Sequence, residues 1–178
     1  MTSQPPADPG QWVLLSYRMP REPSTRRISV WRKLKRLGVA QISDGLVALP
    51  ADARTREHFD WIAEEIRDGG GTAAVWTASP AATSTERDLA TGMATARAAE
   101  YRAILDQATI ARSADPSQGA TALRRLRAEL RRITRRDYFP PVERDLARAA
   151  VDQLARSLDS GDDRDRAADT RLTLEEQR

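Results

Sequence analysis

The chain has 178 residues, with 29 Lys or Arg, 26 Asp or Glu, one His and no Cys. The absence of cysteine excludes disulfides, zinc–thiolate sites, iron–sulfur clusters and thiol chemistry, and the single histidine excludes metal sites built from several histidines. The 40% hydrophobic content is enough for one core. No run reaches the roughly 18 apolar residues of a membrane span, and the first residues lack a signal-peptide pattern. We therefore expect a cytoplasmic protein without membrane contact.

The net charge of +3 hides an uneven distribution along the chain. Residues 18–36 hold eight basic residues and one acidic residue, and residues 124–137 hold seven arginines and two acidic residues. Residues 159–178 hold seven acidic residues and four arginines. The positive charge of the two basic blocks is thus partly hidden in the net charge by the negative charge of an acidic tail.

The first part of the chain alternates strand patterns with helix patterns. Residues 1–10 are polar and rich in Pro, so we expect a disordered lead. Apolar runs with β-branched or aromatic residues predict strands over residues 11–18, 39–43, 46–49 and 72–77. Asp44-Gly45 is a two-residue hairpin signal between the second and third of these strands.

Two amphipathic helices are expected between these strands. The first is capped by Ser24 or Thr25 and ends at Gly38, and the second covers residues 52–68. The expected apolar positions of the first helix recur every three residues at Ile28, Trp31, Leu34 and Leu37, with Val30 beside them. The β-α-β-β-α-β order over residues 11–80 predicts an α+β fold with a ferredoxin-like antiparallel sheet and both helices on one face.

The second part of the chain predicts helices only. A capping box at Thr83 and Glu86 starts a long helix that ends near Arg112. A loop over residues 114–119 and a break at Pro140-Pro141 separate two further helices with facing apolar stripes, which predict a C-terminal αα-hairpin. We thus expect a helical extension over residues 81–158 and a disordered charged tail over residues 159–178.

The two basic blocks are the candidate nucleic-acid-binding segments, because exposed Arg and Lys neutralise phosphates and release counterions. The alternative for each block is a solvated helix face, and arginine richness also follows from a GC-rich genome. In the first block the candidates are Arg18, Arg21, Arg26, Arg27, Arg32, Lys33, Lys35 and Arg36. In the second block they are Arg124, Arg125, Arg127, Arg131, Arg132, Arg135 and Arg136.

Other residue patterns are weaker indications of a metal-binding or phosphate-binding site. Asp60 and Glu64, with Glu57 and His58 nearby, could hold a divalent ion, but we expect an exposed acidic helix face. Gly69-Gly70-Gly71 lacks the lysine of a phosphate loop and is a helix stop. We expect no catalytic residue, no cofactor and no resident metal.

The aromatic residues fit core positions. The four tryptophans are Trp12, Trp31, Trp61 and Trp76, and core packing is the expected role of each. An exposed aromatic beside arginines could instead stack on a nucleic-acid base.

Several segments resemble a known family. The run Trp12-Val13-Leu14-Leu15-Ser16-Tyr17-Arg18-Met19-Pro20-Arg21-Glu22-Pro23-Ser24-Thr25, the later Asp44-Gly45 turn and the sequence Arg135-Arg136-Asp137-Tyr138-Phe139 resemble the N-terminal domain of ChrB, the chromate-resistance regulatory protein. The resemblance covers about residues 11–158. It implies a transcriptional regulator linked to chromate efflux that acts on promoter DNA. Full-length members of that family carry a further C-terminal domain that is thought to respond to chromate, and here we expect a disordered tail in its place.

The element order is also distantly similar to the middle domain of PaaX-type repressors and to small CRISPR-associated endoribonucleases. Those nucleases carry an aspartate at the end of the first strand, where this sequence has Ser16-Tyr17-Arg18. The resemblance to ChrB therefore implies a non-enzymatic DNA-binding regulator. As for other regulators of symmetric operators, we expect a homodimer. Chromate or another oxyanion is a further expected partner, because clustered arginines bind tetrahedral anions.

Two hypotheses from other classes remain open. The first is a metal-dependent nuclease with Asp44, or Asp60 and Glu64, as ligands. The second is an interaction module for a separately encoded sensor protein.

Overall fold

The computed structural model describes the backbone of residues 10–176 and the side chains of residues 10–160. The chain forms two compact units, the N-terminal unit Met1–Ala94 and the helical unit Thr95–Arg178. The division falls inside the helix Thr83–Ala111. It lies 14 residues beyond the boundary expected at residue 80. Residues 1–9 of the expected lead lie outside the described residues.

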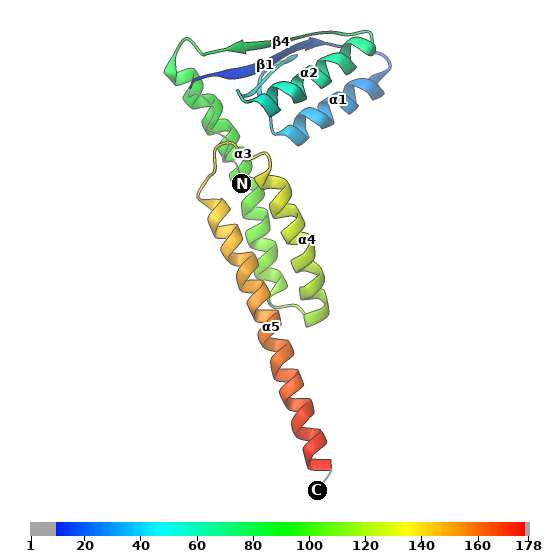
Figure 1. Cartoon of the computed structure of the whole chain (residues 1–178), viewed down its shortest axis with the longest axis vertical. Coiled ribbons are helices and arrows are strands. Elements are labelled where there is room, and N and C mark those ends of the chain that lie inside the picture. The colour runs from blue at the N-terminus through cyan, green and yellow to red at the C-terminus, as the bar shows by residue number, and fades with distance from the viewer. Residues whose placement is uncertain (1–9, 177–178) are drawn as a thin grey trace. The chain divides into compact units, whose positions relative to one another are not determined.

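The N-terminal unit contains one antiparallel sheet of four strands. In chain order these are β1 (Trp12–Arg18), β2 (Ala40–Ser43), β3 (Leu46–Pro50) and β4 (Thr72–Ala78). Their order across the sheet is β2-β3-β1-β4, so β1 pairs with a neighbour on each side (Figure 1). The α+β class and the predicted order of strands and helices are confirmed.

The hairpin between β2 and β3 turns at Asp44 and Gly45, as predicted. Gly45 has a φ of 76°, and a Cβ atom there would lie 2.3 Å from the carbonyl oxygen of Tyr17. The backbone N–H of Tyr17 donates to the Gly45 carbonyl oxygen at 2.7 Å. Only glycine fits this position, and the turn is thereby held against the end of β1.

Helices α1 (Ser24–Leu37) and α2 (Ala53–Asp68) cover one face of the sheet (Figure 1). The core between them and the sheet is apolar and fully buried, and its largest members include Leu15, Leu34, Leu49, Phe59 and Ile66. Asp52 caps α2 in a reciprocal capping box: its carboxylate accepts from the Thr55 N–H at 2.6 Å, and its own N–H donates to the Thr55 hydroxyl at 2.9 Å.

Helix α1 differs from the prediction in two respects. Its N-cap is Pro23 rather than Ser24 or Thr25, and the Ser24 N–H donates to the Glu22 carboxylate at 3.3 Å. Its buried residues are Val30 and Leu34, whereas Ile28 is 45% exposed. Both buried residues are among the predicted apolar positions, whereas Ile28 is not part of the buried stripe, because the contact with the sheet follows the i, i+4 spacing of an α-helix.

The helical unit packs the end of α3 (Thr83–Ala111) with α4 (Pro116–Thr134) and α5 (Glu143–Glu176). Its buried core takes residues from all three helices, including Tyr101, Ile104, Leu126, Ile133 and Leu154. The α4–α5 hairpin is confirmed by this packing, and α3 completes a three-helix bundle. No helix in the described part of the chain has the length and apolarity that crossing a membrane needs.

Two boundaries in the helical unit differ from the prediction. Residues 116–119 belong to α4 rather than to a loop, because the Asp115 carboxylate caps the N–H groups of Ser117 and Gln118, both at 3.1 Å, and Pro116 occupies the first turn. Helix α5 extends to Glu176 and thus includes most of the tail expected to be disordered.

We expect Asp52→Ala to destabilise the N-terminal unit by about 1 kcal/mol, because the first turn of α2 loses a capped N–H. The melting temperature should fall by roughly 2–4 °C. Thermal denaturation followed by circular dichroism measures the change. Glu57→Ala, an exposed position in the same helix, is the matched control, and an equal loss in both variants would contradict a capping role.

Candidate nucleic-acid interface

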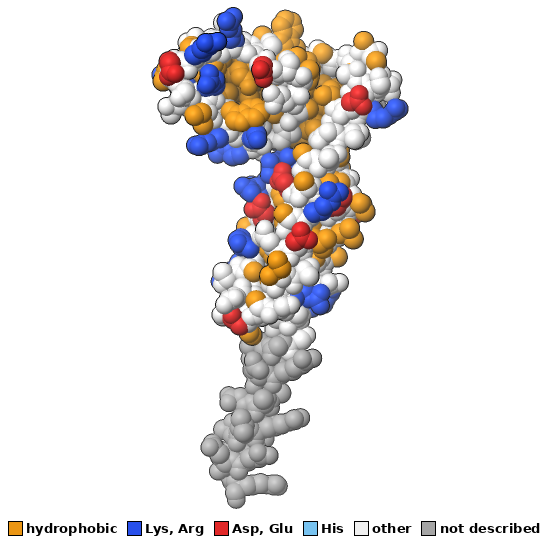
Figure 2. Space-filling model, turned by 180° about the vertical axis from the view of Figure 1, so that it is seen from behind, with side chains coloured by type: hydrophobic (Ala, Val, Ile, Leu, Met, Phe, Trp, Pro, Cys, Tyr) orange, Lys and Arg blue, Asp and Glu red, His pale blue; other side chains and the backbone are white. Residues whose placement is uncertain are grey.

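Most of the first basic block is exposed on the N-terminal unit. The exposed members are Arg18 at the end of β1, Arg21 in the following loop, and Arg26, Arg27, Arg32, Lys35 and Arg36 on α1. Arg32 and Arg36 are one turn apart and lie away from the buried Val30 and Leu34. On the face seen in Figure 2, basic side chains gather at one side of a broad hydrophobic area of this unit.

Lys33 has a different environment from the rest of that block. Its ammonium nitrogen lies 2.5 Å from a Glu65 carboxylate oxygen, so the ion pair joins α1 to α2. Both side chains are a little over one-third exposed, and such a pair contributes less than about 1 kcal/mol to stability. The charge of Lys33 is thus largely neutralised within the protein.

The second basic block forms a regular stripe on α4. Arg124, Arg127, Arg131 and Arg135 are spaced by three, four and four residues, which places them on one helix face, with Arg135 as the C-cap residue that still has helical φ and ψ. All four are exposed, and the buried residues Leu126 and Ile133 lie on the opposite face. None of the ion pairs among the described residues involves any of the four. Below, we call these four residues the arginine stripe.

The remaining arginines of this block contact other residues of the helical unit. Arg125 donates to the Gln107 amide oxygen at 2.9 Å, and Arg132 pairs with Glu129. Figure 2 shows basic and acidic side chains interspersed on the visible face of this unit. An arginine in an ion pair with a carboxylate of the protein attracts a polyanion less strongly. Arg132 is therefore not a member of the arginine stripe.

Arg136 belongs to a half-buried polar cluster. Its guanidinium lies 2.5 Å from Glu100, which also binds Arg97 at 2.9 Å. Burial lowers the pKa of Arg136, and the Glu100 carboxylate opposes this effect. Next to Arg136 in sequence, Asp137 accepts a hydrogen bond from the hydroxyl of buried Tyr101 at 2.9 Å. Arg136 and Asp137 thus attach the end of α4 to α3.

The sequence did not predict this structural role for Arg136 and Asp137. The run Arg135-Arg136-Asp137-Tyr138-Phe139 is specific enough to mark a family resemblance. It does not indicate which residues Arg136 and Asp137 contact. The partners on α3 lie 36 residues away in the chain for both contacts. Only the packing of α3 against α4 brings them together.

The acidic candidates form no metal site among the described residues. Asp60 lies 3.9 Å from Arg56 on the same helix, and Asp44 lies in the β2–β3 turn rather than on α2. The described residues contain no group of three His, Asp or Glu side chains placed to hold a metal ion.

The four tryptophans differ in exposure, and Trp31 on α1 is partly exposed. Trp12 is 2% exposed, as predicted for a core residue, but Trp61 and Trp76 are 70% and 58% exposed. Trp76 donates from its indole nitrogen to the Ser16 hydroxyl at 3.0 Å, and Trp61 borders a cavity with Lys33, Arg36 and His58. The core prediction is wrong for Trp61 and Trp76, because α2 and β4 present these positions to solvent.

We expect Tyr101 and Asp137 to be energetically coupled. Tyr101→Phe removes the hydroxyl that donates to Asp137 and should destabilise the helical unit by about 1 kcal/mol. A double-mutant cycle with Asp137→Ala, measured by urea denaturation, should give a coupling energy of about the same size. Additive effects of the two changes would contradict the attachment of α4 to α3 through this bond.

The chain is similar to known proteins over most of its length. A family model described as Protein ChrB, N-terminal, matches residues 27–170 and so includes the arginine stripe and nearly all of α1. Protein ChrB of Cupriavidus metallidurans is 29% identical over 109 residues, which are 61% of this chain and 30% of that protein. The match thus spans less than a third of the relative. Because the family model covers far more than half of the chain, the protein belongs to the ChrB N-terminal family, a family related to chromate resistance.

Proposed function

We propose that this protein is a DNA-binding transcriptional regulator linked to chromate resistance, and that it contacts DNA phosphates through the arginine stripe and through the outer face of α1. The observation that carries the proposal is the arginine stripe. Four exposed guanidinium groups lie on one face of α4, and no ion pair among the described residues neutralises them. Membership of the ChrB N-terminal family supports the same conclusion.

The spacing of the stripe suits a polyanion. Arg124 and Arg135 are 11 residues apart, which corresponds to about 16 Å along an α-helix. Over that length, one strand of B-DNA presents a phosphate about every 3.4 Å of helix axis. Planar guanidinium groups with several donors bind phosphate oxygens in a bidentate manner, and arginine is therefore better suited than lysine to this contact.

Arg32 and Arg36 on α1 are a second, separate phosphate-contacting pair in this proposal. They are exposed and one turn apart, and no ion pair among the described residues involves them. Lys33, Arg132 and Arg136 are not part of the proposed interface, because each faces a carboxylate of the protein itself.

We expect the stripe variant Arg127→Gln/Arg131→Gln to weaken binding to the DNA upstream of the protein's own gene. Each phosphate contact contributes about 0.9 to the slope of log K against log salt concentration, so the slope should fall by about 1.8. Fluorescence anisotropy over a salt series measures it. Arg156→Gln, which removes an exposed charge from α5, is the control and should leave the slope unchanged.

Several outcomes would overturn the proposal. A slope of log K against log salt concentration near zero for the unmodified protein would exclude phosphate contacts by the stripe. An equal fall of this slope in the stripe variant and in the control would exclude them as well. Cleavage of RNA or DNA in the presence of Mg²⁺ or Mn²⁺ would favour the nuclease hypothesis instead. Repeating the titration with chromate, and with sulfate as the matched oxyanion, tests whether chromate alters DNA binding.

A further inference from the structure

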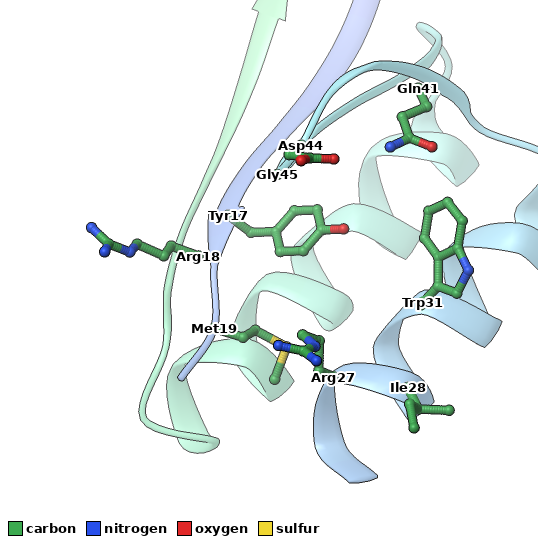
Figure 3. Close-up of a pocket in the computed structure, with 9 residues that line it drawn as sticks. All are labelled: Tyr17, Arg18, Met19, Arg27, Ile28, Trp31, Gln41, Asp44 and Gly45. Atoms are coloured by element: carbon green, nitrogen blue, oxygen red, sulfur yellow. The ribbon is translucent and has the colours of Figure 1, made fainter. Parts of the chain in front are cut away.

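A cavity of about 560 Å³ opens at the end of β1, between α1 and the β2–β3 turn (Figure 3). Its volume lies within the range of roughly 300–1,000 Å³ that is typical of small-molecule sites. The residues that line it are Tyr17, Arg18, Met19, Arg27, Ile28, Trp31, Gln41, Asp44 and Gly45. Below, we call this cavity the β1–α1 groove.

Two aromatic side chains from different elements face the groove. Tyr17 follows Val13 and Leu15 on the helix-facing side of β1, but it lies beyond the filled core and is only half-buried. Its hydroxyl points toward Trp31 of α1 (Figure 3). Trp31 offers an aromatic ring beside the Tyr17 hydroxyl, and base stacking on such a ring is a recurrent mode of nucleotide binding.

The groove wall is held in place by the backbone. The bond from the Tyr17 N–H to Gly45, and the contact that only glycine permits at that turn, fix the position of Asp44 beside Tyr17. Burial, and to a lesser extent the Asp44 carboxylate, raises the pKa of the Tyr17 hydroxyl above its ordinary value. The phenol is therefore a neutral donor at physiological pH.

The polar groups of the groove match the edge of a base. The Gln41 amide offers both donors and an acceptor, and the Asp44 carboxylate accepts from amino or ring N–H groups. This pairing of an amide with a carboxylate suits a heterocycle that carries donors and acceptors side by side.

The charges around the groove favour an anionic ligand. Arg27 reaches the groove from α1, and Lys35, one turn after Trp31 on the same helix, lies 5.2 Å from the centre of the Trp31 ring. Arg18 lines the groove but points away from the other side chains in Figure 3. Arg27 and the neighbouring Lys35 outnumber the single carboxylate of the lining, so an anion is expected beside Arg27.

We propose that the β1–α1 groove binds an unpaired nucleotide, with the base stacked on Trp31, the base edge read by the Tyr17 hydroxyl, Gln41 and Asp44, and the phosphate held by Arg27. The nucleotide is either a free mononucleotide or an unpaired residue of a single-stranded nucleic acid. This site goes beyond duplex binding, since it uses neither the arginine stripe nor the Arg32–Arg36 pair.

The test follows the Trp31 indole N–H in ¹H–¹⁵N spectra of the full chain, identified by its loss in Trp31→Leu. Adenosine, guanosine, cytidine and uridine monophosphates are titrated separately, as is a five-nucleotide single strand of mixed sequence. We expect at least one of these ligands to shift the Trp31 signal. Ribose 5-phosphate and inorganic phosphate, which lack a base, should not shift it.

Variants separate the parts of the site. Trp31→Leu should weaken binding, measured by calorimetry, by about tenfold, which is typical of the loss of one stacking ring. Gln41→Ala, at an exposed position, should weaken it without risk to folding. Arg27→Gln should weaken binding of the monophosphate by about tenfold and leave binding of the corresponding nucleoside unchanged, because only the phosphate contacts Arg27. Trp61→Leu, outside the groove, is the control.

Each result bears on the proposal in one direction. A shift caused by the mononucleotides supports a free nucleotide as the ligand, and a shift caused by the oligonucleotide alone supports a nucleic-acid strand. Equal effects of ribose 5-phosphate, no shift with any ligand, or equal weakening in Trp61→Leu would overturn it. Arg127→Gln/Arg131→Gln should retain nucleotide binding, so failure of the groove and failure of the duplex proposal are distinguished.

Discussion

Burial of one face of β1 beneath α1 and α2 is the interaction on which the N-terminal unit depends. Val13 and Leu15 are almost completely buried there, and β1 alone pairs with both β3 and β4. The two-residue alternation of the strand continues past the filled core and brings Tyr17 to the surface beside α1. The wall of the β1–α1 groove is therefore a consequence of the same register that forms the core.

The arginines of the two basic blocks fall into different physical classes once their neighbours are known. Arg136 is half-buried beside Glu100 and joins α4 to α3, and Lys33 joins α1 to α2 through Glu65. The arginine stripe faces solvent, and no ion pair among the described residues involves it. An ion pair within the protein competes with a phosphate for the same guanidinium, so local carboxylates decide which arginines can serve a polyanion.

Periodicity and turn chemistry predicted the elements of this fold well. Gly38 and Gly45 mark a helix end and a hairpin because both require a positive φ, which the residue type alone indicates. The capped start of α4 at Asp115 and Pro116 was missed, although both residues favour helix starts, because the short polar segment carries no apolar stripe. The exposure of Trp61 and Trp76 was also missed, since residue type gives no information on which face of an element is covered.

The amino-acid sequence by itself determined the order of strands and helices, the hairpin turn and the placement of two basic blocks, because each depends on residues that are close together in the chain. Tertiary structure alone decided which basic residues are neutralised and which aromatic residues face solvent. It also decided that Tyr17, Arg27, Trp31, Gln41 and Asp44 meet around one groove. These properties depend on distances between residues that are remote in sequence, and only the packing of sheet and helices sets those distances.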